Sequence, residues 1–149
     1  MNTRVGWSVL AVLTVAIIGS AIALVMMPAP ANGPTSETPG EQFVSEKVKV
    51  VSPTQHAIVP KTFVVKGEAR GTWYFEASFP IQVRNPANNL VGQGIAQATA
   101  DWMTEAFVPF EATVTVPDYA GPADLVFVKD NPSGLPEHDD SVEFPIIVQ

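Results

Sequence analysis

Apolar and polar residues alternate with a period of two along most of the chain after residue 45. Successive side chains of a β-strand point to opposite faces, so this alternation predicts strands with one buried face. No stretch in this part keeps apolar residues at helical spacing for three turns. The clearest predicted strands are EKVKVVS, TFVVKGEAR, FEATVTV and SVEFPIIV, which begin at residues 46, 62, 110 and 141.

Two further segments are predicted as strands on different patterns. DLVFVK, residues 124–129, is apolar on both faces, which is typical of a central strand. LVGQGIAQA, residues 90–98, carries glycines that weaken a strand, so its pattern is the least clear.

The segment GTWYFEASFP, which begins at Gly71, contains four aromatic rings and one carboxylate. Its alternation predicts one long strand that continues to Arg84, with Tyr74 and Glu76 on the polar face. Pro80 lacks an N–H group and so predicts a bulge or a sheet edge. The residues predicted to face the core are Trp73, Phe75, Ala77, Phe79, Ile81 and Val83.

About seven such strands within residues 46–149, separated by turns such as NPANN and AGP, predict a fold class. That class is all-β, an immunoglobulin-like antiparallel β-sandwich made of two sheets packed face to face. The chain has no cysteine, so packing rather than a disulfide must hold the sandwich together.

A different pattern precedes the strands, because residues 5–27 form an uncharged, largely apolar run. A helix of this length spans about 35 Å, enough to cross the roughly 30 Å hydrocarbon core of a bilayer. Arg4 supplies the positive flank that stays in the cytoplasm. We therefore expect residues 1–27 to be a single transmembrane helix or signal anchor, which places the rest of the chain outside the cytoplasm.

A cleaved secretory signal is the competing interpretation of this run. Residues 29–31, Ala-Pro-Ala, have the small-x-small shape of a cleavage site, although the apolar run is longer than a usual signal core. Under both interpretations the residues after the apolar run are exported. Residues 28–45 are rich in Pro, Gly, Ser, Thr and Glu and are predicted to be a linker.

The charge of the chain narrows the classes of partner. All fifteen acidic residues follow the apolar run, and the net charge is −7. Such a balance argues against nucleic acid, whose phosphates need a basic surface, and against binding an anionic leaflet. The plain interpretation is that the charge keeps a small domain soluble.

Candidate catalytic chemistry is sparse, so the sequence predicts a protein that is not an enzyme and needs no cofactor. The two histidines, His56 and His138, stand in predicted loops, and no G-x-S-x-G motif is present. One acidic loop, Lys129 to Glu143, collects oxygen donors of the kind that calcium prefers. Its spacing matches no EF-hand, and a solvated turn is the favoured interpretation. The candidate calcium ligands are Asp130, Asn131, Glu137, Asp139 and Asp140.

Aromatic residues are the other candidates for binding. A glycan platform requires two or three coplanar exposed rings, whereas a partner protein requires an anchor at the rim of an interface. Trp102 is expected either to be such an anchor or, as we favour, to plug the open end of the sandwich. The candidate partner-binding residues are Trp73, Tyr74, Trp102 and Tyr119.

The chain from about Val48 to Val148 resembles the immunoglobulin-like domain associated with bacterial spore germination. The residues that carry the resemblance are Ser52-Pro53, Pro60, Gly67, Ala69-Arg70, Phe75-Glu76, Trp102, Pro109-Phe110 and Pro145. The resemblance implies a β-sandwich module without known catalysis, found beside other extracytoplasmic modules or alone behind a membrane anchor. We therefore expect a non-catalytic module at the cell envelope that binds another envelope protein, with glycan or peptidoglycan binding as the alternative.

Overall fold

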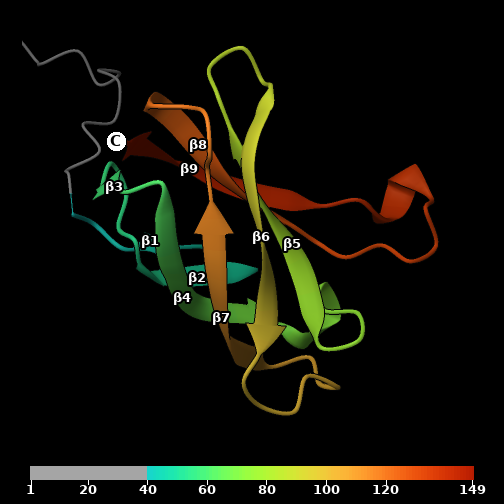
Figure 1. Ribbon diagram of the computed structural model, residues 1–149. Coiled ribbons are helices and arrows are strands. Elements are labelled where there is room, and N and C mark those ends of the chain that lie inside the picture. Colours follow the sequence, from blue (N-terminus) through green and yellow to red (C-terminus); the bar gives the residue numbers. More distant parts are fainter. Residues whose placement is uncertain (1–39) are drawn as a thin grey trace, which may run out of the picture. The chain divides into compact units, whose positions relative to one another are not determined.

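The chain from Gly40 to Gln149 folds into a domain whose regular secondary structure is almost entirely β-strand (Figure 1). This computed structural model describes residues 40–149. Two short 3-10 helices lie in loops, η1 at Gly71–Trp73 and η2 at Pro136–His138. The strands are β1 Phe43–Val44, β2 Val48–Ser52, β3 Ile58–Val59, β4 Thr62–Arg70, β5 Ser78–Arg84, β6 Leu90–Ala98, β7 Phe107–Thr115, β8 Gly121–Val128 and β9 Ser141–Val148.

The nine strands of residues 40–149 form one hydrogen-bonded sheet in the order β1-β2-β4-β7-β6-β5-β8-β9-β3. The sheet curls until its ends face each other, and Phe43 of β1 stacks on Phe144 of β9 at 5.1 Å between ring centroids. The all-β prediction is confirmed, but the prediction of about seven strands in two separate sheets is wrong. β6 pairs with both β5 and β7, which joins the two layers into a single sheet.

The alternation of the sequence decides which side chains enter the core. In β4, Phe63, Val65, Gly67 and Ala69 are buried, and the residues between them are more exposed, as predicted. The strands β2, β7 and β9 follow their predicted alternation in the same way. Gly67 allows two strands to approach, because a Cβ there would lie 2.2 Å from the carbonyl oxygen of Lys49 on β2.

The prediction of one long strand from Gly71 to Arg84 is wrong in its first half. Glu76 and Ala77 have φ values of 50° and 63°, and this left-handed pair reverses the chain before β5 begins at Ser78. The residues before this turn therefore do not continue the inward and outward alternation of the strand that follows it. Tyr74 is therefore buried and Phe75 is 42% exposed, the reverse of the prediction.

The second half of that stretch behaves as predicted. Phe79, Ile81 and Val83 of β5 are completely buried. Pro80 lies one residue before β5 begins to pair with β8 at Ile81, so at this point β5 has a strand partner on one side only. This agrees with the edge expected there, whereas the irregularity in register lies at Val83–Arg84.

The segment before β4 covers both edges of the sheet with two short strands that the sequence did not predict. β1 pairs with β2, and β3 pairs with β9 in parallel, so the sheet is not wholly antiparallel. The chain passes between the two edges after the cis peptide bond Ser52–Pro53. Because β1 lies within residues 28–45, the predicted linker extends too far and the folded domain begins before Glu46.

The N-terminal predictions lie mostly outside the described residues. The transmembrane helix predicted over residues 1–27 and most of the predicted linker fall within residues 1–39, which the structure does not describe. Within residues 40–149, no helix is long and apolar enough to cross a membrane.

The packing around Phe79, at the centre of the core, predicts how single substitutions change the free energy of unfolding. Phe79 is completely buried and contacts Trp73, Tyr74 and Phe110 edge to face, with centroids 6.2, 5.0 and 5.1 Å apart. Phe79→Ala should lower the free energy of unfolding by about 3–5 kcal/mol because it opens a cavity. Phe75→Ala, the matched control, should cost less than about 1 kcal/mol. Urea denaturation followed by tryptophan fluorescence measures both, and equal losses would contradict this account of the core.

Candidate functional site

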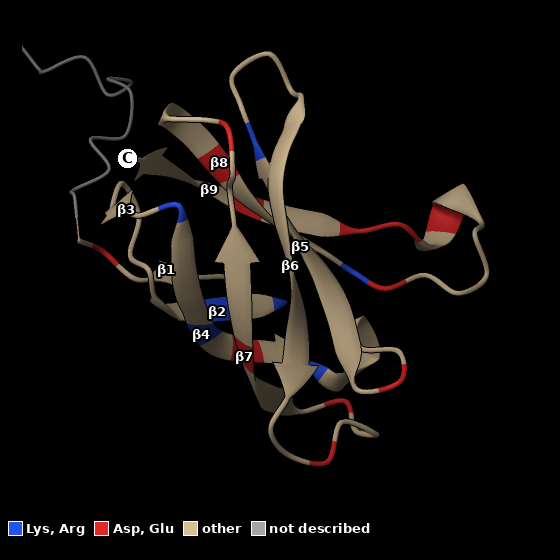
Figure 2. Ribbon diagram, in the orientation of Figure 1, with Lys and Arg blue, Asp and Glu red and all other residues tan. Residues whose placement is uncertain are grey.

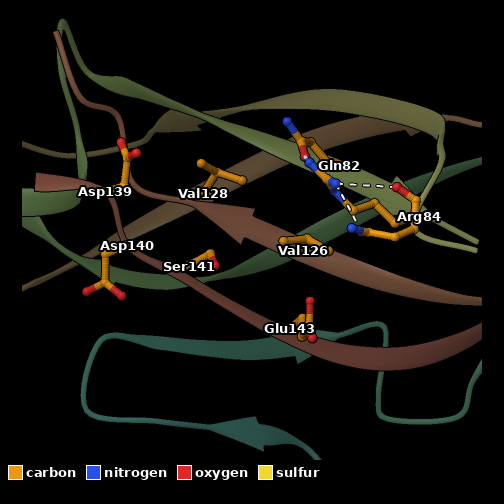
Figure 3. Close-up of a pocket in the computed structure, with 9 residues that line it drawn as sticks. Gln82, Arg84, Val126, Val128, Asp139, Asp140, Ser141 and Glu143 are labelled. Atoms are coloured by element: carbon orange, nitrogen blue, oxygen red, sulfur yellow. Dashed lines mark hydrogen bonds between the residues drawn. The ribbon is translucent and has the colours of Figure 1, made fainter. Parts of the chain in front are cut away.

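A shallow groove crosses the outer face of β5, β8 and β9, on the side of the sheet away from the core (Figure 3). The strands place residues in rows across this face, with Gln82 opposite Val126 and Val126 opposite Glu143. Figure 3 shows Gln82 and Arg84 at one end of the groove and the two aspartates at the other. The lining residues are Gln82, Arg84, Asn88, Val126, Val128, Asp139, Asp140, Ser141 and Glu143.

The floor of the groove is apolar. Val126 is only 4% exposed, yet it does not belong to the cluster of buried residues that forms the core. It is buried on the opposite side of β8 from Leu125 and Phe127, under the side chains of the neighbouring strands. This explains why DLVFVK is apolar on both faces: one face fills the core, and the other forms the floor of the groove.

Arg84 is held in one orientation at the end of the groove. Its Nε and Nη2 donate to Oε1 of Gln82 at 3.0 and 2.8 Å, and its Nη1 donates to Oδ1 of Asn88 at 3.0 Å. Asn88 itself is set by a turn in which Oδ1 of Asn85 accepts two backbone N–H groups. Within residues 40–149, amide oxygens rather than carboxylates are therefore the hydrogen-bond partners of this guanidinium group.

The acidic end of the groove is formed by the predicted calcium loop, but its oxygens are engaged separately. Asp139 Oδ1 accepts a hydrogen bond from Nδ2 of Asn131 at 2.8 Å. Asp140 Oδ2 lies 2.7 Å from Nζ of Lys47. Lys47 directly precedes β2 and Asp140 directly precedes β9, and these two strands lie near opposite ends of the strand order. No group of three or more acidic or histidine residues within residues 40–149 is arranged to hold a metal ion. Of the five candidate ligands, Asn131 and Asp139 are joined by a hydrogen bond, and Asp140 is paired with Lys47.

One contact in this loop involves a serine and a histidine. Oγ of Ser133 lies 2.9 Å from Nδ1 of His138 and donates its single hydrogen to Oδ1 of Asn131. A nucleophilic serine must instead give its proton to the histidine. Because the Ser133 hydrogen is directed at Asn131, the contact links Asn131, Ser133 and His138 within the loop.

The four predicted partner-binding aromatics do not form a common surface. Trp73 and Tyr74 are 3% and 4% exposed, so both are withdrawn into the core by the turn before β5. Trp102 is half-buried and packs against the core. Tyr119 is also half-buried, and its hydroxyl donates to the carbonyl of Pro122.

The sequence interpretation named Asp139 and Asp140 of the groove as candidate calcium ligands but missed the residues on its strands, although a signal was present. Gln82 and Arg84 stand on the polar face of the strand predicted to end at Arg84. Val126 is an apolar residue of DLVFVK, on the face opposite Leu125 and Phe127. Nothing in one sequence shows that β5 and β8 are neighbours, and the groove exists only because they pair.

Fold and site together define an immunoglobulin-like β-module whose outer face carries a mixed apolar and charged groove. A model of the family described as the immunoglobulin-like domain of bacterial spore germination matches residues 47–134. The match covers more than half of the chain, and the chain belongs to this family, as the resemblance implied. No curated protein and no solved structure matches the chain.

Tyr74 predicts a dependence of stability on alkaline pH. Burial raises the pKa of its phenol, and the hydroxyl donates to the carbonyl of Val108 at 2.7 Å. Above pH about 10 the unfolded chain loses this proton while the folded chain keeps it, so stability should fall as pH rises. Tyr74→Phe should cost about 1–2 kcal/mol at pH 7 and show a smaller alkaline loss.

Urea titrations between pH 7 and 11 measure this difference. Tyr119→Phe is the matched control, since it also removes a phenol but leaves Tyr74 in place, and it should keep the alkaline loss of the unsubstituted protein. An alkaline loss that is the same in Tyr74→Phe would show that another group is responsible.

Proposed function

We propose that the chain is a membrane-anchored, non-catalytic, extracytoplasmic module that binds another protein of the cell envelope. The uncharged run at residues 5–27 and Arg4 beside it support a single-pass anchor with a cytoplasmic N-terminus. Membership of the spore-germination family supports an immunoglobulin-like module at the envelope.

The groove on β5, β8 and β9 is the observation that carries the proposed binding function. The residues that contribute most binding energy to a protein interface are typically ordered arginines and apolar side chains that become fully desolvated. Arg84 is already ordered by Gln82 and Asn88, so binding a partner loses little side-chain entropy there. Val128, which is half-buried in the groove, offers apolar surface beside the buried Val126, and Glu143 offers the opposite charge.

The alternative of glycan or peptidoglycan binding has less support. It required two or three exposed coplanar rings among the candidate aromatics, and the structure buries Trp73 and Tyr74. A non-catalytic role is also favoured by the arrangement of Ser133, which directs its hydrogen to Asn131 and not to His138.

Membrane anchoring predicts how the chain behaves in cell fractionation. The full chain should remain in the membrane pellet after an alkaline carbonate wash, because a spanning helix is held by its apolar surface and not by charge. A variant without residues 1–27 should lose this retention. External protease should digest residues 40–149 in intact spheroplasts, and protection from protease would contradict the proposed orientation.

Partner binding in the groove predicts a position-specific crosslink in cells. A photoreactive amino acid at Ser141, which is exposed in the groove, should yield a discrete adduct that mass spectrometry identifies as an envelope protein. The same probe at Thr113, an exposed position on β7, is the matched control and should yield none. Adding Arg84→Ala should reduce the Ser141 adduct about fivefold or more, as expected for a key interface arginine.

Equal adducts at Ser141 and Thr113 would contradict a specific groove. An adduct at Ser141 that Arg84→Ala leaves unchanged would place the partner on this face without contact to the guanidinium.

A further inference from the structure

A second depression, which we call the β3 hollow, lies at the corner where β2 ends, β3 begins and β4 starts. Its exposed rim consists of Val51, Ile58 and Val64, which are 57%, 60% and 43% exposed. Its floor includes the buried side chains of Val59 and Phe63. Every residue that lines the β3 hollow is uncharged.

The lack of charge is unusual on a domain as acidic as this one. Residues 50–60 contain no Lys, Arg, Asp or Glu, and Figure 2 shows β3 itself in tan, with a blue segment next to it at the start of β4. The charged residues beside it are Glu41, Lys61 just before β4, and Lys66, which pairs in register with Ser52 of β2 and is itself paired with Glu111. Exposed aliphatic side chains grouped in this way are typical of a surface that binds a protein or a membrane.

The position of the β3 hollow, close to the point where the chain enters the domain, indicates which of these it contacts. Gly40 N–H donates to the carbonyl of Gln55 at 3.2 Å, and Gln55 N–H donates to the carbonyl of Glu41 at 2.9 Å. The chain therefore enters the domain beside the loop whose residues Thr54 and Ala57 line the β3 hollow.

The length of chain before this point is short. Residues 28–39 separate the predicted membrane span from Gly40, and a coil of this length has an end-to-end distance of about 20 Å. A domain of this size has a radius of gyration of about 13 Å. A tether comparable with the size of the domain keeps the part where the chain enters closest to the bilayer.

We propose that the β3 hollow rests on the lipid bilayer, with Val51, Ile58 and Val64 in the headgroup region. This inference rests on the proposed membrane anchor. The tether supplies a high local concentration of bilayer, so contacts by three aliphatic side chains suffice without strong intrinsic affinity. The acidic side chains elsewhere do not oppose this contact strongly, because charges are screened beyond about 8 Å at physiological salt.

A second copy of the chain fits the β3 hollow less well than lipid. A stable dimer buries about 800 Å² on each partner, which three aliphatic side chains cannot supply alone. Glu41 beside the hollow opposes anionic lipid, so the expected surface is zwitterionic, and the test uses phosphatidylcholine.

The test uses the absence of cysteine, which allows a label at a single introduced cysteine. The full chain carries Ile58→Cys labelled with an environment-sensitive fluorophore and is reconstituted into phosphatidylcholine vesicles with a headgroup-level nitroxide lipid. The matched control is Leu135→Cys, which is 48% exposed and lies in the β8–β9 loop, away from β3 (Figure 1). The Ile58 label should be quenched about twofold more strongly than the control, because only lipid contact brings the nitroxide near it.

A second variant guards against an effect of the label alone. Val51→Asp in the Ile58→Cys background should lower the quenching toward the control value, because a carboxylate on the rim keeps the surface hydrated. Equal quenching at Ile58 and Leu135 would overturn the proposal. A blue-shifted Ile58 label without nitroxide quenching would also overturn it, because the β3 hollow would then be covered by protein.

Failure of the anchor gives a different result from failure of this inference. An alkaline carbonate wash of the same vesicles removes the chain if residues 5–27 do not anchor it. A chain that stays in the vesicles but shows equal quenching at the two labels keeps its anchor and has no lipid contact at the β3 hollow.

Discussion

The fold depends on a continuous row of phenylalanine rings that holds the curled sheet closed. Phe79, Phe110, Phe127 and Phe144 contact one another in sequence, with centroids 5.1, 6.1 and 5.9 Å apart, and Phe43 stacks on the last of them. Phe79, Phe127 and Phe144 come from the consecutive strands β5, β8 and β9, whereas Phe110 on β7 and Phe43 on β1 come from the other half of the sheet order. Without cysteine, burial of this row is the main force that brings the two halves together, since each aromatic side chain removes a large apolar area from water.

The alternation of the sequence was sufficient to predict most strands because burial of one face acts on each strand separately. β4 shows this well: every second residue from Phe63 to Ala69 is buried, as the pattern indicates. The prediction failed at Glu76 and Ala77, because non-glycine residues seldom adopt a left-handed conformation and nothing local announces it. β1 and β3 escaped prediction because two residues are too few to show a period, and only their pairing, with the adjacent β2 and the distant β9, defines them.

The candidate site was harder to predict than the fold, for a related physical reason. A core position needs only an apolar side chain, which the sequence states directly. The groove needs Gln82, Val126 and Glu143 in one row, and that row is a consequence of the register among three strands. The aromatic candidates failed for the opposite reason: Trp73 and Tyr74 were visible in the sequence, but rings of this size are more stable inside a small domain than on its surface.

The short strands at the two sheet edges connect the fold to its proposed role. An open edge pairs readily with other chains, and β1 and β3 cover the edges of β2 and β9 with segments too short to recruit a further long strand. Specific contact is then left to side chains on the faces and at the corners of the sheet. The same segment that covers the edges also carries the uncharged loop around Gln55, where the chain enters the domain. A single stretch of about twenty residues, from Gly40 to Val59, thus protects both edges of the sheet from nonspecific pairing and places Gly40 beside the uncharged loop around Gln55.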